Sequence, residues 1–329
     1  MSNTHAARPT DLVALVTFDG EVRENMAITR ERLGLAPAPP RPLNAAIEQW
    51  LGLGRQTWIT VRGRQVHGIA TARELSERTA WQIDTLIDAE SGDGDVLRDL
   101  LRQAARAADR ARVSHVLLRT RAGSAAVDAA LRAGFVPALQ ERLWGTPLGH
   151  PVAPAESEAP DEAPDAPARA ATVRPATDAD TFPLFQLSSR ALPIEARQVL
   201  AMTMAEWKAL RERRWCARGE SLVALDGDRV VASLRAGGDG DTLQVEIVAD
   251  PGGRCEPAAD ALFDAAIAEV GAPRRVVALV PASATAVESV VRARGLAPES
   301  EFVLLARRTA RPIREAAPAR AGVVIPTGG

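Results

Sequence analysis

The feature that most constrains the fold of this chain is an order of segments that occurs twice, once on each side of residues 147–171. Residues 147–171 are mainly Pro, Ala and acidic residues without apolar periodicity, so they bury too little surface to offset the entropy of ordering. We therefore predict a disordered linker there. It separates an N-terminal domain at 1–146 from a C-terminal domain at 172–310, each expected to fold by itself, and a flexible tail follows at 311–329.

The N-terminal half has the predicted order hairpin, strand, helix, strand, helix, strand. The hairpin turns at Arg62-Gly63-Arg64, and the second helix stops at Gly134, because glycine is favoured just past the last helical turn. The predicted ranges are 56–61, 65–71, 80–88, 95–111, 115–119 and 124–133.

The C-terminal half repeats this order around a hairpin turn at Asp226-Gly227-Asp228. Its predicted ranges are 221–225, 229–234, 243–249, 257–270, 276–280 and 284–293. This alternation predicts an α/β (α+β) fold, with helices on both faces of a mixed sheet. We interpret the repeat as a duplication or a fusion of relatives.

Composition excludes several classes of function. The net charge of −2, with acids interleaved among the bases, argues against nucleic acid as a partner. No apolar run approaches the roughly 20 residues of a membrane span, and the N-terminus lacks a signal-peptide pattern. The cysteines, Cys216 and Cys255, have no CxxC neighbour, and the histidines lack metal-binding spacing. We predict a soluble cytoplasmic protein without a metal or a disulfide.

The segment Val248–Phe263 reads VADPGGRCEPAADALF. It resembles the fourth strand and phosphate loop of the GNAT N-acetyltransferases, which typically read Val-Asp-Pro-x-x-Arg/Gln-x-x-Gly-x-Gly/Ala. Pro251 and Arg254 match this pattern, whereas Pro257 stands at the place of the central glycine. The resemblance implies two GNAT-like acyl-CoA N-acyltransferase domains, each a mixed, mostly antiparallel sheet flanked by helices.

The resemblance also implies where acetyl-CoA would bind as co-substrate. The first N–H groups of a helix have no partner within the helix, and together with the helix dipole they bind a pyrophosphate. Pro257 removes one such donor. Arg254 either supports the pyrophosphate loop or is a surface arginine in a Gly-rich turn. The implied cofactor-binding residues are Val248 and Ala249, whose backbone would hold the pantetheine arm, and Arg254, Cys255, Glu256, Ala258 and Ala259 in the loop.

The matching loop of the N-terminal half, within 83–101, is less suited to phosphate. Its glycines would permit a close approach, but no Arg or Gln is present, and the carboxylates of Glu90, Asp93 and Asp95 crowd the loop. Three carboxylates repel a phosphate strongly when water is excluded. We therefore expect the C-terminal domain to bind acetyl-CoA.

Glu246, on the predicted strand 243–249, is the candidate general base, acting directly or through a water molecule. The alternating strand pattern also allows a solvent-facing Glu246. Asp84 in the N-terminal half has the same two interpretations. The chain contains no tyrosine, which is the residue that often protonates the leaving thiolate in the family that this sequence resembles.

Other chemically capable residues have structural interpretations. We expect His67 and His115 to be structural, and Cys216 to be a half-buried apolar residue, because no histidine is placed beside it in the sequence. Four tryptophans of the N-terminal half either line a substrate groove or anchor the core. They are Trp50, Trp58, Trp81 and Trp144.

Two functions remain. The first is an acyl-CoA-dependent N-acyltransferase that transfers an acetyl group directly to an unidentified amine of a small molecule or protein, with the leaving thiolate protonated by solvent. The second is a non-catalytic pseudo-acetyltransferase that binds a ligand or a protein, which the acidic loops, Pro257 and the absence of tyrosine favour. A weaker possibility is that one domain binds CoA as a regulatory ligand. The sequence does not indicate an oligomeric state.

Overall fold

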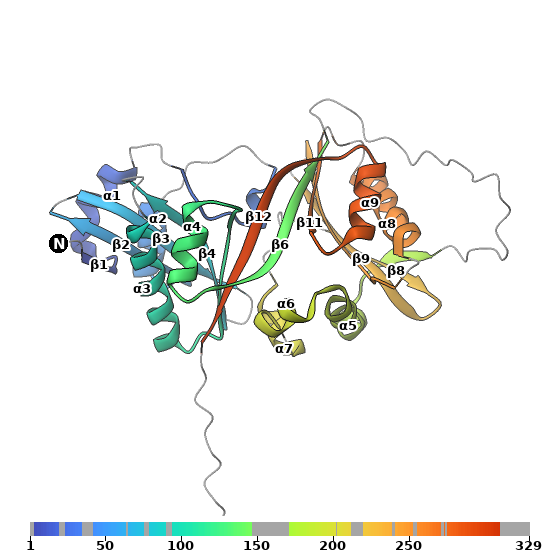
Figure 1. Cartoon of the computed structure of the whole chain (residues 1–329), viewed down its shortest axis with the longest axis horizontal. Helices are drawn as coiled ribbons and strands as arrows, with labels where there is room; N and C mark the ends of the chain where they lie inside the picture. The colour runs from blue at the N-terminus through green and yellow to red at the C-terminus, as the bar shows by residue number, and fades with distance from the viewer. Residues whose placement is uncertain are drawn as a thin grey trace, which may run out of the picture.

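In the computed structural model, the described residues form one sheet of twelve strands with helices on both of its faces (Figure 1). The described residues are 3–19, 24–34, 42–63, 65–75, 79–89, 94–146, 171–201, 203–211, 220–238, 241–252, 255–270, 273 and 275–309. The predictions for the linker, apart from residue 171, and for the tail at 311–329 lie outside these residues.

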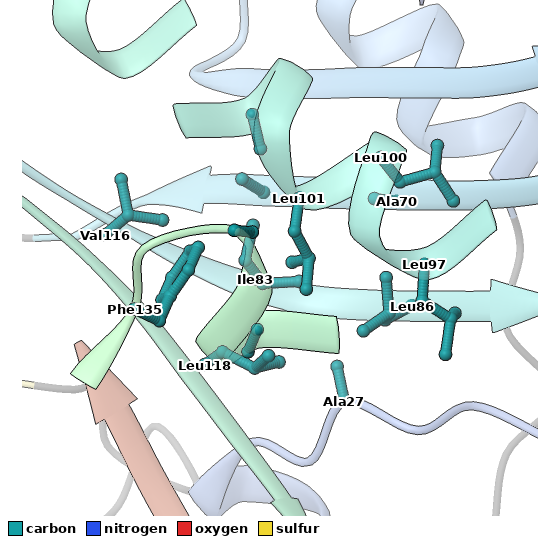
Figure 2. Close-up of a cluster of buried hydrophobic side chains, with 14 of the residues drawn as sticks. Ala27, Ala70, Ile83, Leu86, Leu97, Leu100, Leu101, Val116, Leu118 and Phe135 are labelled. Atoms are coloured by element: carbon teal, nitrogen blue, oxygen red, sulfur yellow. The ribbon is translucent and has the colours of Figure 1, made fainter. Parts of the chain in front are cut away.

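The strands of the N-terminal half are β1 (Asn3–Ala6), β2 (Arg55–Arg62), β3 (Gln65–Glu74), β4 (Ala80–Asp88), β5 (His115–Arg121) and β6 (Val136–Gly145). Its α-helices are α1 (Leu12–Asp19), α2 (Pro42–Trp50), α3 (Asp95–Ala111) and α4 (Ala125–Arg132). Helices α1 and α2 cover one face of the sheet, and α3 and α4 cover the other. Figure 2 shows the second of these cores, in which Leu97 and Leu101 of α3 lie near Leu86 and Ile83 of β4.

The C-terminal half repeats this arrangement. Its strands are β7 (Thr172–Pro175), β8 (Glu220–Asp226), β9 (Arg229–Gly238), β10 (Thr242–Ala249), β11 (Arg275–Pro281) and β12 (Ala297–Arg308). Its α-helices are α5 (Thr181–Ala191), α6 (Ile194–Val199), α7 (Met204–Ala209), α8 (Cys255–Val270) and α9 (Thr285–Ala293). Helix α5 packs on one face through Leu187, and α8 packs on the other through Leu262 and Phe263.

The predicted elements and the α/β fold class are confirmed. Each predicted range lies inside its observed element or exceeds it by one residue at one or both ends. Helix α3 buries its apolar stripe as its 3.6-residue periodicity requires, and the chain leaves α4 through Gly134 at φ +85°. The repeat extends to side chains: Asp11 and Asp180 each end a short 3-10 turn, and each caps it by accepting a backbone N–H three residues earlier.

The two halves exchange their last strands, which the sequence did not predict. The order in the sheet is β1-β2-β3-β4-β5-β12-β6-β11-β10-β9-β8-β7. Strand β12 therefore pairs with β5 of the N-terminal half, β6 pairs with β11 of the C-terminal half, and β6 and β12 pair with each other at the centre (Figure 1).

The exchange mixes the two cores. Trp144 of β6 is buried in the core of the C-terminal half, and Leu305 of β12 is buried in the core of the N-terminal half. The domain boundaries at 146 and 172 were inferred from the sequence repeat, and they stay a prediction. The expectation that each half folds by itself does not fit a shared sheet, because each core needs a strand from the other half.

Each half contains one pair of parallel strands that pair over a short length and then part. The β4 residues that pair with β5 are Ala80–Ile83, and the β10 residues that pair with β11 are Thr242–Val245. Beyond these residues all four strands continue without a ladder to the parallel neighbour, within the described residues. We call the gap beyond Ile83 the N-terminal opening and the gap beyond Val245 the C-terminal opening.

Candidate functional site

The N-terminal opening is filled by residues 25–28 of the same chain. Met26 donates its N–H to the carbonyl of Leu86 on β4 (2.9 Å), and Ile28 donates its N–H to the carbonyl of Arg119 on β5 (2.8 Å). The side-chain amide of Asn25 adds two bonds to the β4 backbone, one from the N–H of Leu86 (2.8 Å) and one to the carbonyl of Asp84 (2.9 Å). This segment thus occupies the gap between the strands.

We call residues 25–28 the plug. Its side chains also help to fill the opening. Ala27 is buried in the core beneath α3, and Figure 2 shows it at the edge of the cluster that contains Leu86 and Leu118. A segment that bonds both strands and fills the space between them leaves no room for a second extended chain.

Asp84 lies at this opening, but it is neither solvent-facing nor placed as a base. It is the extra residue of a β-bulge, because Thr71 and Ala72 of β3 face Thr85 and Ile83. Its carboxylate accepts a hydrogen bond from the hydroxyl of Thr71 (2.6 Å) and forms an ion pair with Arg55. Asp84 is therefore a buried structural acid.

The C-terminal opening is continuous with a cavity of about 200 Å³. Residues 246–249 of β10 line it on one side, and Pro281, the last residue of β11, and Ala284 line it on the other. Residues of α5 and α7, and of the short segments that follow α5, α6 and α7, line it on another side. These helices lie on one face of the sheet (Figure 1). Strands β5, β6 and β12 contribute Leu117, Leu139 and Leu304, so the strand exchange builds part of the wall.

The backbone of β10 is oriented toward this opening at alternate residues. In an antiparallel ladder the backbone groups alternate along the strand. One residue bonds the partner strand with its N–H and C=O groups, and the next residue directs both groups away from that partner. Asp250 donates its N–H to Val231 of β9 (2.9 Å), and the carbonyl of Asp241 accepts from Arg275 on the β11 side (3.0 Å). By this alternation Ile247 and Ala249 direct their N–H and C=O groups to the opening. Val248, for which a backbone contact with the pantetheine arm was predicted, directs its own backbone groups to β9.

Glu246 lies on the cavity wall between two arginines. Its Oε1 is 2.8 Å from Nη1 of Arg30, and its Oε2 accepts from Nη1 of Arg235 (3.1 Å). The Glu246 side chain is 20% exposed, which places it on the wall and not in bulk solvent. Both oxygens of the Glu246 carboxylate are thus engaged by guanidinium groups. Its role as general base stays a prediction.

Arg30 connects this site to the exchanged strands. It follows the plug, and Nη2 of its guanidinium is 3.3 Å from Oε1 of Glu141 on β6. Glu141 in turn forms a fully buried ion pair with Arg119 of β5 (2.6 Å). The result is a row of five alternating charges from Arg119 to Arg235 that crosses from one half to the other.

The loop predicted to hold pyrophosphate leads into α8, which begins at Cys255. The side chains of Cys255, Ala258 and Ala259 are buried in or beside the core, so these residues reach a ligand only through their backbone. Burial raises the pKa of the Cys255 thiol, with smaller contributions from nearby carboxylates, which keeps the thiol neutral. Glu256 is exposed, and Arg254 lies outside the described residues.

Asp250 organises the start of this loop, a role that sequence reasoning missed. Its carboxylate pairs with Arg190 of α5 (2.9 Å) and with Arg229 of β9, and it accepts the N–H of Gly252 (3.3 Å). Desolvation raises the pKa of Asp250, but the Gly252 N–H and the two arginines outweigh it, so the net shift is downward. The sequence did contain a signal for this role. Asp250 stands directly before Pro251, and the GNAT pattern that this segment resembles also carries an Asp before its Pro.

The remaining candidates are structural. Trp58 and Trp81 lie in the N-terminal core with ring centroids 6.1 Å apart. Trp144 lies in the C-terminal core, and the indole N–H of Trp50 bonds the carbonyl of Ala7 (3.1 Å), so all four tryptophans are anchors. His115 is fully buried.

His67 is half-buried on β3, and no described contact assigns it a chemical role. Cys216 lies outside the described residues, as do Glu90 and Asp93. Asp95 begins α3 and pairs with Arg98. Among the described residues, no helix is long and apolar enough to cross a membrane, and no cluster of His, Cys, Asp and Glu is placed to hold a metal ion.

Comparison with known protein structures identifies the fold. The structure of a GCN5-related N-acetyltransferase from Sphaerobacter thermophilus is 15% identical, covers 93% of this chain and 95% of its own, and has a TM-score of 0.53. A tandem GNAT protein from the clavulanic acid biosynthesis pathway is 13% identical over 95% of this chain and 100% of its own, with a TM-score of 0.49. No family model and no curated protein sequence match. The first of these likenesses shows the GNAT fold of the chain.

Proposed function

We propose that this chain, which has the GNAT fold, is an acyl-CoA-dependent N-acyltransferase that works from its C-terminal opening. The observation that carries the proposal is the contrast between the two openings. Residues 25–28 fill the N-terminal opening, whereas residues 246–249 line a cavity at the C-terminal one. Acetyl-CoA is the proposed acyl donor, and an amine is the acceptor.

The plug at 25–28 suggests how the pantetheine arm of CoA would bind. Met26 donates its backbone N–H to the carbonyl of Leu86 on the edge of β4 that faces the opening, and the side-chain amide of Asn25 accepts the N–H of Leu86. Pantetheine also carries amide groups along an extended chain. On β10 the groups that face the opening belong to Ile247 and Ala249, and we assign the pantetheine contact to them.

The pyrophosphate is assigned to the N-terminus of α8. The first N–H groups of this helix have no partner within the helix, and Pro257 has no N–H to offer. Arg254 would add a charge-assisted contact. The backbone donors that remain at this end are those of Cys255, Glu256 and Ala258, with Ala259 in the following position.

The transfer itself is direct. The amine nitrogen attacks the thioester carbonyl carbon, the carbon–sulfur bond breaks, and the electron pair leaves with sulfur. Glu246 accepts the proton of the amine through water, and the thiolate takes a proton from solvent. Most of the acceleration comes from holding the two reactants together, which does not require a tyrosine.

Calorimetric titration of acetyl-CoA into the full-length protein tests the proposal. We expect one site per chain, because the plug occupies the second opening. CoA release, followed as free thiol in the presence of an amine mixture, tests turnover. Absence of saturable binding at millimolar acetyl-CoA would refute the proposal, and two equal sites would refute its assignment to the C-terminal opening.

The variant Arg254→Ala sharpens the test. A charge-assisted contact contributes about 1.5–3 kcal/mol, so its loss should weaken acetyl-CoA binding roughly tenfold or more. Asp95→Ala, at the corresponding helix start of the N-terminal half, is the matched control and should leave the affinity unchanged. An equal effect of both variants would count against the C-terminal loop.

The alternative is a non-catalytic module that binds acyl-CoA without transferring the acyl group. The observation that favours it is the pairing of Glu246 with Arg30 and Arg235, which stabilises the charged carboxylate. Saturable acetyl-CoA binding at one site, with no thiol release from any amine, would select this alternative.

A further inference from the structure

The cavity at the C-terminal opening combines an apolar wall with one charged end. Its residues are contributed by both halves, and apolar area dominates its lining. The apolar wall includes Leu184, Leu192, Leu200, Trp207, Leu210 and Leu222. Such a wall favours a ligand with an apolar group of its own, because binding removes apolar surface from water.

The charged end places a carboxylate beside guanidinium groups. Glu246 lies 2.8 Å from Arg30 and 3.1 Å from Arg235, and all three side chains line the cavity. Arg211 also lines it, with its guanidinium carbon 5.1 Å from the ring centroid of Trp207. Among the described residues, the charged side chains on the wall are thus three arginines and one glutamate.

An α-amino acid has the complementary arrangement. It carries an ammonium and a carboxylate on the same carbon atom, so its ammonium meets Glu246 while its carboxylate meets Arg235 and Arg30 in the same pose. Arginine is suited to this role, because its planar fork matches a carboxylate and stays charged. An amine without a carboxylate would leave the arginines of this end without that contact.

We infer that the acceptor is a free α-amino acid with an apolar side chain, which rests on the proposed function. The side chain lies against the leucines and Trp207, and the carboxylate is held by Arg235 and Arg30. The ammonium gives one proton to Glu246 through water, and the neutral nitrogen bonds the thioester carbon. Sulfur leaves with the electron pair and is protonated by solvent, and the new amide loses its extra proton to water.

A matched series of three ligands tests this inference. Leucine, leucinamide and 3-methylbutylamine share one apolar group and one amine, and only leucine carries a carboxylate. We expect calorimetry on the full-length protein to show leucine binding at least tenfold more tightly than the other two. Equal binding of all three, or no leucine binding at millimolar concentration, would overturn the inference.

The variant Arg235→Gln keeps a polar, hydrogen-bonding side chain but shortens it and removes its charge. It should erase the preference for leucine over leucinamide. Arg292→Gln is the control, since Arg292 is an exposed arginine of the same half on α9 that does not line the cavity. If the preference survives Arg235→Gln and Arg30→Gln alike, the carboxylate is not held at this end, and the inference fails.

The failure of this inference is distinguishable from failure of the proposed function. Acetyl-CoA binding with thiol release, at equal rates for leucine and 3-methylbutylamine, would overturn the acceptor class and leave the acyltransferase in place. Selective leucine binding without any acetyl-CoA binding would support the amino-acid site and overturn the acyltransferase.

Discussion

The N-terminal and C-terminal openings begin from the same four-residue parallel pairing and then differ in what occupies them. In the N-terminal half, residues 25–28 bond both strands, and Asp84 is buried in an ion pair with Arg55. In the C-terminal half, the corresponding edge of β10 lines a cavity, and Glu246 lies on its wall. The two halves thus share one arrangement of strands, but the chain itself fills the opening of one half, and the opening of the other half borders a cavity.

This difference indicates a division of labour. The N-terminal half supplies Arg30, Leu117 and the exchanged strand β6 to the site of the other half. A half whose own opening is filled can still shape a cavity from its outer strands.

The largest expected effect comes from separating the halves. Proteolysis within 147–170 should leave two fragments that co-elute on gel filtration, because β6 and β12 each complete the sheet of the other half. Fragments 1–146 and 172–310 expressed alone should lack a cooperative unfolding transition. Two stable, separately eluting fragments would restore the interpretation of two independent domains.

Removal of the buried charge between the halves should have the next largest effect. Glu141→Ala leaves the fully buried guanidinium of Arg119 without its carboxylate, and breaking such a pair costs about 3–5 kcal/mol. Urea unfolding measures this loss. Glu301→Ala breaks an exposed pair with Arg142 on the same central strands and should cost at most about 1 kcal/mol. Similar losses for both variants would contradict the burial of Arg119.

A weaker perturbation targets the plug. Asn25→Ala removes the side-chain bonds to the β4 backbone and should lower the free energy of unfolding by about 2 kcal/mol. Acetyl-CoA should still bind at one site, since Met26 and Ile28 keep their bonds to both strands. A second site in this variant would show that Asn25 alone keeps the N-terminal opening closed. Asn44→Ala, on the exposed side of α2, is the control.

The smallest expected effect concerns the two short 3-10 turns that Asp11 and Asp180 cap, one near the start of each half. The hydrogen bonds from Arg174 to Asp180 (2.7 and 2.8 Å), with those from Thr177, hold the pKa of Asp180 well below its usual range despite desolvation. Its counterpart Asp11 accepts the backbone N–H of Arg8 (2.8 Å) and lies 3.3 Å from Nε2 of His5. Asp180→Asn should therefore destabilise the protein by about 1–2 kcal/mol at pH 7, and Asp11→Asn by less.

The pH dependence of Asp180→Asn has a defined sign. A depressed carboxyl pKa stabilises the fold above the unfolded pKa of about 3.9, and this stabilisation is lost as the pH falls through the folded pKa. The difference between wild type and Asp180→Asn in chemical denaturation should thus shrink below about pH 4. A difference that stays constant from pH 7 to pH 3 would contradict the ion pair.

The sequence alone determined the local structure and its repetition. The apolar stripe of α3, the alternation of β10 and the glycine stop after α4 depend on residues a few positions apart, so periodicity predicts them. The same local logic placed a phosphate-loop pattern before α8. The charges of the two loops also favoured the C-terminal half as the acetyl-CoA-binding half, because the charges within one loop follow from the sequence without knowledge of the fold.

Only the tertiary structure decided which strands pair and which charges meet. Nothing near Trp144 specifies that β6 completes the sheet of the other half, and the repeat itself allows either partner. Arg30 and Glu246 are more than 200 positions apart, so no spacing rule connects them, and the plug at 25–28 had no periodicity to mark it. Strand partners and ion pairs depend on which distant segments bury one another, and that is settled by the packing of the whole chain.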